Sequence, residues 1–360
     1  MRIEKFTNLY RDVTKEGTKI PQEKYCLAGQ FPIVDQGQRV IAGWWNDDDG
    51  IFKDVPAIIF GDHTRAIKYM EEPFFIGADG VKILRPTNVN DNPKYLYYAL
   101  QSAKIPNLGY SRHFKVVKEL EIRMYSRDEQ DEIVRVLEKI DYLIEQRHVE
   151  TTYIDQLVKS RFIELFGEPL RNPHGYKQTK LSDIATYYNG LTYKPENVAA
   201  EGTIVLRSSN IQNSQLDFAD TVRVDCAIKG RLMVQENDIL MCSRNGSAKL
   251  VGKVALIKNI QEPMSFGAFM MIIRSRYFGY LMTYFQMDAF RQQIKTGATT
   301  TINQITGRML DDVTIPLPPM ALVDRFTAFV EQTDKSKLAV QKGLQELEIL
   351  KKSLMQQYFG

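Results

Sequence analysis

Cysteine and histidine are scarce in this sequence, and the few present are widely spaced. The three cysteines (Cys26, Cys226 and Cys242) include no CxxC pair, and the four histidines include no HxH or HExxH. Zinc sites and disulfide frameworks both require such residues at short, regular spacings. We therefore expect no metal site, and reduced thiols in a cytoplasmic protein.

Long apolar runs are also missing. No stretch approaches the roughly 18 residues that suggest a membrane-spanning helix. The first residues, MRIEKFTNLYRDVTKEG, are polar and charged, unlike a signal peptide. With 44% apolar and 25% charged residues, the composition is that of a soluble globular protein, and 360 residues suffice for two domains.

Catalytic motifs are lacking too. The loop GSAKLVGKV (246–254) has five residues between its glycines and Val254 where a phosphate loop needs Ser or Thr. No GxGxxG opens a helix, and DNPK, RNPH and LPPM do not fit the Pro-Pro-aromatic motif of amino-type DNA methyltransferases. Asp54 and Asp62 flank the strand-like PAIIF, but no Glu-x-Lys follows on the next strand. The sequence thus predicts no reaction, and a magnesium-dependent nuclease with a degenerate signature remains an alternative.

What the sequence does contain is an internal repeat. DEIVRVLEKID (131–141) recurs as DRFTAFVEQTD (324–334) at an offset of 193 residues. Upstream, KYLYYALQ (94–101) resembles GYLMTYFQ (279–286) at an offset of 185, and ELEI (119–122) parallels DVTI (312–315). The changing offset places insertions in loops. The chain is predicted to be a duplication, with a block and a long helix in each half.

Each long helix carries an apolar stripe with coiled-coil spacing. Residues 128–166 would span about 58 Å as a helix, which is too long to bury the stripe on a small domain, so we expect the two helices to pair. The alternative is that each helix packs only on its own block. The expected seam residues are Ile133, Leu137, Ile140, Ile144, Ile154, Val158, Phe326, Val330, Val340, Leu344, Leu347 and Leu354.

The two blocks are predicted to be α+β. Strand-like runs are PAIIF (56–60), VKIL (81–84), GTIVLR (202–207), DILMC (238–242) and FMMIIR (269–274), and helices are expected around 93–104 and 277–294. Residues 128–170 hold 5 basic and 11 acidic side chains, whereas 1–127 hold 19 and 16 and 171–312 hold 17 and 12. The mildly basic blocks favour a nucleic-acid-binding surface.

The chain resembles the specificity subunit of type I restriction-modification systems. The motifs that carry the resemblance are IPLPPMALVDRFTAFVEQTD (315–334), SRDEQDEIVRVLEKID (126–141), KSRFIELFG (159–167), KKSLMQQYFG (351–360), GQFPIVDQGQRVIAGWW (29–45) and TIVLRSSNIQN (203–213). The first half departs from the family by having LEIRMYSRDEQ in place of an IPLPP run. Its N-terminus is short, which leaves open a trimmed first block or a late start site.

The resemblance implies an α+β fold with two target-recognition domains in tandem repeat, separated by two long helices that form an antiparallel coiled coil. The implied domains are a first target-recognition domain (1–127), a central helix (128–170), a second target-recognition domain (171–314) and a distal helix (315–360). It further implies a non-catalytic subunit that recognises a bipartite double-stranded DNA target. Methyltransferase (modification) subunits and an ATP-dependent restriction subunit would dock on it, and S-adenosylmethionine, ATP and magnesium would bind those partners rather than this chain.

Polar loops at equivalent points of the two halves are the expected DNA contacts, because Arg, Asn, Gln, Ser, Thr and His side chains bind base edges and phosphates. In the first block they are Gln36, Gln38, His63, Thr64, Arg65, Tyr110, Arg112 and His113. In the second they are Ser208, Ser209, Asn210, Ser243, Arg244, Asn245, Thr299, Thr300 and Thr301. A competing function is a scaffold whose coiled coil and blocks bind other proteins.

Overall fold

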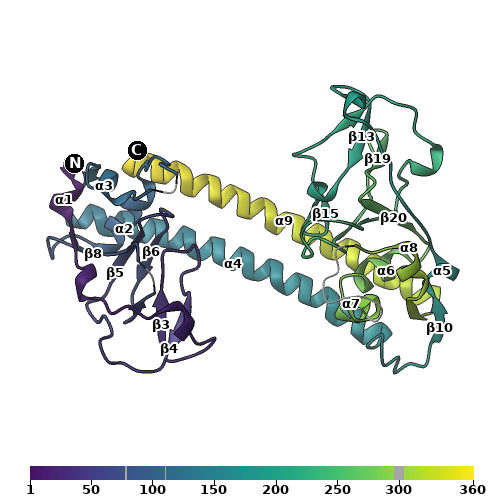
Figure 1. Cartoon of the computed structure of the whole chain (residues 1–360), viewed down its shortest axis with the longest axis horizontal. Coiled ribbons are helices and arrows are strands. Elements are labelled where there is room, and N and C mark those ends of the chain that lie inside the picture. The colour runs from purple at the N-terminus through teal and green to yellow at the C-terminus, as the bar shows by residue number, and fades with distance from the viewer. Residues whose placement is uncertain (78, 110, 296–303) are drawn as a thin grey trace. The chain divides into compact units, whose positions relative to one another are not determined.

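A computed structural model of the chain describes residues 1–77, 79–109, 111–295 and 304–360. These residues divide into two compact units. Unit 1 is formed by Met1–Val149 and Val340–Gly360, and unit 2 by Glu150–Ala339. Two long helices, α4 (Arg127–Phe166) and α9 (Met320–Phe359), run without a break in Figure 1, and each contributes to both units.

The block of unit 1 is built from short strands and three helices. Their bounds are β1 (Arg2–Lys5), α1 (Phe6–Leu9), β2 (Tyr10–Asp12), β3 (Phe31–Val34), β4 (Gly43–Trp45), β5 (Ala57–Gly61), β6 (Ile67–Met70), β7 (Phe75–Ile76), β8 (Val81–Pro86), α2 (Pro93–Ser102), α3 (Phe114–Val117) and β9 (Glu121–Met124). The sheets have the orders β2-β8-β5-β6, β4-β3-β7 and β1-β9. Short 3-10 helices occupy Thr14–Glu16 and Gln22–Lys24.

Strand β5 is buried on both faces. Ile58 and Phe60 belong to an apolar cluster with residues of α1, α2 and α4, whereas Ala57 and Ile59 belong to a second cluster that includes β3 and β7. Because side chains of a strand alternate between faces, one continuous apolar run supplies both clusters. The sheet is therefore covered by helices on one side and by the second sheet on the other.

Unit 2 contains a similar block. Its elements are β10 (Lys177–Lys180), α5 (Leu181–Ile184), β11 (Thr186–Asn189), β12 (Val198–Ala199), β13 (Thr203–Leu206), β14 (Ile211–Gln212), β15 (Gln215–Leu216), β16 (Arg223–Val224), β17 (Ile239–Cys242), β18 (Val254–Leu256), β19 (Met264–Phe266), β20 (Met270–Arg274), α6 (Phe278–Tyr284), α7 (Asp288–Lys295), α8 (Gly307–Asp311) and β21 (Thr314–Leu317). Short 3-10 helices lie at Pro195–Asn197, Ser208–Asn210 and Gly230–Leu232. The sheets have the orders β11-β20-β17-β18, β12-β16-β13-β19, β10-β21 and β14-β15.

The two blocks have matching topology, which confirms the duplication. The order β2-β8-β5-β6 corresponds to β11-β20-β17-β18, and the parallel pair β3/β7 corresponds to β13/β19. Single contacts also repeat. The Tyr95 hydroxyl of α2 donates to the Arg123 carbonyl at 2.5 Å, and the Tyr280 hydroxyl of α6 donates to the Pro316 carbonyl at 3.1 Å.

Each unit is completed by the end of one long helix. In unit 2, Phe166 at the end of α4 packs against Tyr280, with ring centroids 5.0 Å apart. In unit 1, Phe359 at the end of α9 packs against Tyr95 at 5.2 Å. The same aromatic pair is thus used twice, once at the end of each helix.

The long helices pack against each other within each unit. In unit 2, Asp155 of α4 pairs with Lys337 of α9 at 2.6 Å, and Phe166 lies near Phe326 with ring centroids 5.3 Å apart. Because the later residue of α4 meets the earlier residue of α9, the helices are antiparallel there. In unit 1, Asp141 pairs with Lys351 at 2.5 Å. The predicted antiparallel coiled coil is confirmed.

The start of each long helix is set by local sequence. Ser126 donates its backbone N–H and its hydroxyl to Glu129, at 2.9 and 2.7 Å, in a Ser-x-x-Glu arrangement that caps the first turn of α4. Helix α9 follows Pro319, whose carbonyl accepts from the backbone of Leu322 and Val323. None of the described helices has both the length and the apolar character that crossing a bilayer requires.

The five predicted strands and the helix at 93–104 are present, but the single helix predicted over 277–294 is wrong. The chain forms α6 and α7 with a break at residues 285–287. Phe285 and Phe290 are both fully buried, with ring centroids 4.8 Å apart. In one straight helix, residues five apart point about 140° away from each other, so the break lets both rings enter the core.

Candidate nucleic-acid interface

The polar loops predicted in the first block converge at the carboxyl ends of β3 and β5. We call residues 35–38, 61–65, 105–109 and 111–113 the strand-end site of unit 1. The Gln36 side-chain oxygen accepts from the His63 backbone N–H at 3.3 Å, and the Thr64 hydroxyl donates to the Gln36 carbonyl. A side chain at Gly61 would come within 2.9 Å of the Gln36 carbonyl, so glycine allows the two loops to approach this closely.

The third loop of this site is anchored by His113, which was expected to contact DNA. Its ring is fully buried, with Nδ1 donating to the Asp62 carbonyl at 2.8 Å and Nε2 accepting from the Leu108 N–H at 3.1 Å. Asp62 in turn accepts from the Phe114 N–H at 2.7 Å. With both ring nitrogens engaged inside the protein, His113 positions the loop and presents no group to a ligand.

The second block builds the same arrangement at the ends of β13 and β17. The strand-end site of unit 2 comprises residues 207–210 and 243–247 together with Gln304 and Ile305. The Asn245 side chain donates to the Ser208 hydroxyl at 3.2 Å, as Thr64 contacts Gln36 in unit 1. The Ile305 N–H donates to the Ser243 carbonyl at 2.7 Å, as the His113 N–H donates to the Asp62 carbonyl at 2.9 Å.

Backbone pairing fixes which residues of the two sites correspond. The Asp62 N–H donates to the Gly80 carbonyl, and the Ser243 N–H donates to the Phe269 carbonyl. Likewise the Gly77 N–H donates to Val34 and the Gly267 N–H to Leu206. Counting onward from these pairs, the matched positions are Gln36 with Ser208, Gln38 with Asn210, His63 with Arg244, and Thr64 with Asn245.

Two predicted contacts of unit 2 are structural. Asn210 is fully buried, accepts from the Arg207 N–H at 2.8 Å, and donates to the carbonyls of Asp217 and Asp220 at 2.8 and 2.9 Å. Ser243 is 3% exposed and donates its hydroxyl to the Phe269 carbonyl at 2.9 Å. Both residues support the loops of the site, because their side-chain polar atoms bond to backbone groups of the protein.

The remaining predicted contacts differ in exposure. Gln38, Arg112 and Arg244 are exposed. Those that are half-buried are Gln36, His63, Thr64, Arg65, Ser208, Ser209 and Asn245. Arg65 donates one guanidinium N–H to the Ile105 carbonyl at 3.2 Å. Tyr110, Thr299, Thr300 and Thr301 lie outside the described residues.

Some of the positive charges at the two sites are neutralised by neighbouring carboxylates of the protein. Lys68 is buried and contacts Asp35 at 3.4 Å, and burial lowers the pKa of its ammonium. Arg207 pairs with Asp220 at 2.8 Å. Arg112 and Arg244 keep exposed guanidinium groups. These two are therefore the best-placed charges for a phosphate or a base edge.

The predicted seam residues divide into two groups. Ile133, Leu137, Ile140 and Phe326 are buried, and the others are half-buried, namely Ile144, Ile154, Val158, Val330, Val340, Leu344, Leu347 and Leu354. Val158 and Val330 pack on the core of unit 2, and Leu354 packs on the core of unit 1. Much of the stripe therefore also contacts the blocks.

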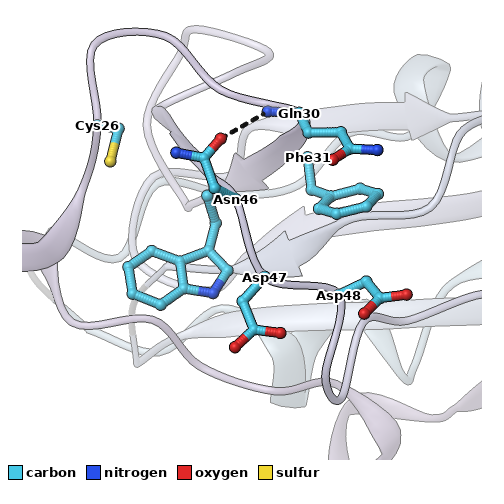
Figure 2. A pocket seen from close by; sticks show the side chains of 7 residues that line it. Cys26, Gln30, Phe31, Asn46, Asp47 and Asp48 are labelled. Atoms are coloured by element: carbon cyan, nitrogen blue, oxygen red, sulfur yellow. Dashed lines mark hydrogen bonds between the residues drawn. The ribbon is translucent and has the colours of Figure 1, made fainter.

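A pocket of about 670 Å³ lies beside β3 and β4 of unit 1 (Figure 2). Its lining is Cys26, Gln30, Phe31, Trp45, Asn46, Asp47 and Asp48. None of the predicted DNA contacts lines it, and the carboxylates of Asp47 and Asp48 would repel phosphate. Among the described residues, no three His, Cys, Asp or Glu side chains gather as metal ligands.

Sequence reasoning missed Phe269, which is 59% exposed next to Arg244. It ends the connection from β19 to β20, and a lone exposed phenylalanine has no sequence signature that separates it from a core residue. The run FMMIIR placed it at the start of a buried strand. The strand begins at Met270, which leaves Phe269 outside the core.

Comparison with known proteins finds one matching family model and several similar proteins. Residues 173–348 match the sequence model described as the type I restriction modification DNA specificity domain. The specificity subunits of the type I restriction enzymes EcoKI, from Escherichia coli (strain K12), and StySPI, from Salmonella potsdam, are each 26% identical to this chain over 196 residues. Each match covers 51% of this chain and 42% of the relative, which is less than half of the relative's length.

Solved structures resemble the chain over nearly its whole length. The type I restriction-modification S subunit from M. genitalium aligns with a TM-score of 0.59 at 16% identity, covering 100% of this chain and 96% of that one. A structure concerning complex assembly and conformational transition of the type I R-M system aligns with a TM-score of 0.56 at 15% identity, covering 99% and 97%. The chain thus has the fold of type I restriction-modification specificity subunits, and its residues 173–348 match the sequence model of the type I restriction modification DNA specificity domain.

Proposed function

We propose that the chain is a non-catalytic specificity subunit that recognises a bipartite double-stranded DNA target, with one half of the target bound by each unit. The observation that carries the proposal is the presence, in one chain, of two strand-end sites with matching backbone contacts and different side chains. Matching scaffolds would present their side chains to DNA in the same manner, and different side chains would select different bases.

The long helices suit the role of a connection between two DNA-binding blocks. Helices of 40 residues are stiffer than a Gly- or Ser-rich linker. When two linked sites are held at a fixed separation, binding of the first raises the effective concentration of the second only on DNA with the matching spacing. We infer that the helices fix the distance between the two halves of the target.

The outer faces of the helices support docking of partner subunits. Tyr153 and Leu157 of α4 are 64% and 52% exposed, and Leu338 and Ile349 of α9 are 63% and 69% exposed. Large apolar side chains on helices that already pair are typical of surfaces that bind another protein. The proposed partners are modification (methyltransferase) subunits and an ATP-dependent restriction subunit, which would bind S-adenosylmethionine, ATP and magnesium.

The test uses the chain in complex with a modification (methyltransferase) subunit. Adenine methylation is mapped across a library of duplexes, first to find the target and then to compare Arg244→Ala with Arg112→Ala. We expect each variant to relax the sequence requirement of one half only, because the two arginines lie in different units. Unchanged methylation of every duplex by both variants would remove these residues from the interface.

The same preparation separates this proposal from its competitors. Cleavage of DNA by the chain alone with magnesium would indicate a nuclease and would contradict a non-catalytic role. Absence of any sequence-selective DNA binding in the complex would favour a protein-binding scaffold.

A further inference from the structure

Phe269 lies beneath Arg244 in the strand-end site of unit 2, and its backbone is held in place. Its backbone carbonyl accepts from the Ser243 N–H at 2.9 Å, the Arg244 N–H at 3.0 Å and the Ser243 hydroxyl at 2.9 Å. Three hydrogen bonds from the end of β17 thus hold the residue in place, although its side chain is 59% exposed. An aromatic ring held open to solvent in this way is available to support another group.

That group is the guanidinium of Arg244, which lies 5.4 Å from the centroid of the Phe269 ring. The backbone of Arg244 is also fixed, by its N–H to Phe269 and by a β-bridge to Gln304. Stacking on an aromatic face leaves the N–H groups at the edge of the guanidinium free to donate. Arg244 is therefore restrained at its backbone and at its tip.

Three other arginines of unit 2 form ion pairs with carboxylates of the protein. Arg207 pairs with Asp220, Arg223 with Glu262 and Arg274 with Asp238. Among the described residues, no carboxylate pairs with the guanidinium of Arg244, which rests on a ring instead. The charge and the planar donor pattern of Arg244 are thus left for a ligand.

We propose that Arg244, positioned by Phe269, recognises a guanine in the half of the target that unit 2 binds. The inference rests on the proposed function. Guanine presents two acceptors, O6 and N7, in the major groove, and a guanidinium fork matches both at once, whereas the Lys ammonium does not. Phe269 is the positioning residue, because stacking reduces the freedom that Arg244 would otherwise lose on binding.

The experiment measures equilibrium binding of the complex with the modification subunit to its own target duplex, with single guanines replaced by 7-deazaguanine, which lacks the N7 acceptor. At one guanine we expect the replacement to weaken wild-type binding and to have little further effect on Arg244→Lys. Arg244→Lys should weaken binding to the unmodified duplex by about 5- to 150-fold.

Phe269→Ala should weaken binding at the same guanine by about 2- to 5-fold, the size of an exposed cation–π contact. Phe269→Tyr keeps the ring and should restore both the affinity and the sensitivity to 7-deazaguanine. Arg231→Ala, which removes an exposed arginine elsewhere in unit 2, is the charge-matched control and should leave that sensitivity unchanged. Circular dichroism checks that each variant is folded.

The outcomes separate the two proposals. If the wild-type complex binds duplexes of unrelated sequence as tightly as its target, the proposed function fails. If the wild-type complex selects its target but no guanine replacement interacts with Arg244→Lys, the guanine assignment is overturned. If Phe269→Ala weakens every duplex equally, or Phe269→Tyr fails to restore the sensitivity, Phe269 is not a positioning residue.

Discussion

Unit 2 carries Arg244 on the ring of Phe269, whereas unit 1 carries His63 against the backbone of Gly80 at the matched positions. Gly80 has a φ of +86°, and a Cβ there would lie 2.9 Å from the His63 ring. One backbone hydrogen bond beneath both residues is the same, from Asp62 to Gly80 and from Ser243 to Phe269. The next N–H differs, because that of His63 donates to the Gln36 side chain and that of Arg244 to the Phe269 carbonyl. The duplication is therefore preserved in the backbone contacts, and the groups offered to a ligand have diverged.

The long helices show a similar contrast between the units. Phe166 is buried among Phe162, Tyr280 and Phe326, whereas its counterpart Phe359 is half-buried beside Tyr95. Asp141 is held by the Tyr98 hydroxyl and by Lys351, whereas Asp334, at the matched position of the repeat, lies near Lys337 and Asp155. The repeated helices thus contribute unequally to the two cores.

The largest expected effect comes from the aromatic cluster. Phe166→Ala should lower the free energy of unfolding by about 3–5 kcal/mol, because it removes a buried ring and leaves a cavity. The control, Phe359→Ala, should cost less, since its ring is only half-buried. Urea denaturation followed by circular dichroism measures both, and equal losses would contradict the contrast between the units.

The second prediction concerns the matched pair Asn210 and Gln38. Asn210→Ala should cost about 2–4 kcal/mol, because it leaves the Asp217 and Asp220 carbonyls and the Arg207 N–H without their partner. Gln38→Ala changes an exposed side chain and should cost under about 0.5 kcal/mol.

Fluorescence adds a control to this pair. Both tryptophans, Trp44 and Trp45, belong to unit 1, so their emission reports the unfolding of that unit. Asn210→Ala should shift the circular dichroism transition more than the fluorescence transition. A larger shift in fluorescence would mean that Asn210 does not act within unit 2.

The third prediction tests the close approach of two loops in unit 1. Gly61→Ala should cost about 1–3 kcal/mol, because its Cβ would press on the Gln36 carbonyl and the Thr64 hydroxyl. Gly61→Ala should also weaken DNA binding, but through only one half of the target. The matched residue of unit 2 is Cys242, and Cys242→Ser, which changes a buried sulfur to oxygen there, should not affect the same half.

The smallest expected effect has opposite signs in the two units. Burial and the nearby carboxylate of Asp155 raise the pKa of Asp334, so its charged form is disfavoured in the folded state. The contribution of the protonated Asp334 side chain to the stability of the protein is therefore present below the unfolded pKa of an aspartate. It is lost as pH rises through the folded pKa. Asp334→Asn should therefore stabilise the protein at pH 7, and the gain should vanish at acid pH. The gain should be no more than about 0.5 kcal/mol, because the carboxyl is only partly buried and much of the residue is exposed to solvent.

Asp141→Asn should destabilise the protein at pH 7, because it removes the charge that pairs with Lys351. The loss should be under about 1 kcal/mol for a partly exposed pair. Urea titrations of both variants between pH 3 and pH 7 measure the difference. The same sign for both variants would show that the two positions have equivalent surroundings.

Much of the fold could be predicted because duplication and apolar patterning are explicit in the sequence. The helices, the strand runs and the pairing of the helices follow from local spacing. The break between α6 and α7 does not, because it depends on Phe285 and Phe290 meeting in the core. A period of 3.6 residues indicates an amphipathic helix but not where tertiary packing interrupts it.

The candidate site could be located but not resolved residue by residue. Turn-forming and polar residues pointed to loops that lie together in each unit, yet His113, Asn210 and Ser243 are buried supports. The same Asn or Ser can bind a base or cap its own loop, and only the surrounding carbonyls decide which. Phe269 was overlooked because its role depends on Arg244, a neighbour 25 residues away in the sequence.

The completion of unit 1 by the end of α9 has a consequence for the order of events during synthesis. The residues that close its core follow Val149 only after the 190 residues of unit 2 have been made. A chain emerging from the ribosome exposes its first block early, with Tyr95 lacking its Phe359 partner, while unit 2 can close as soon as the first half of α9 appears. The later-made unit would therefore finish folding first, against the usual N-terminal-first order.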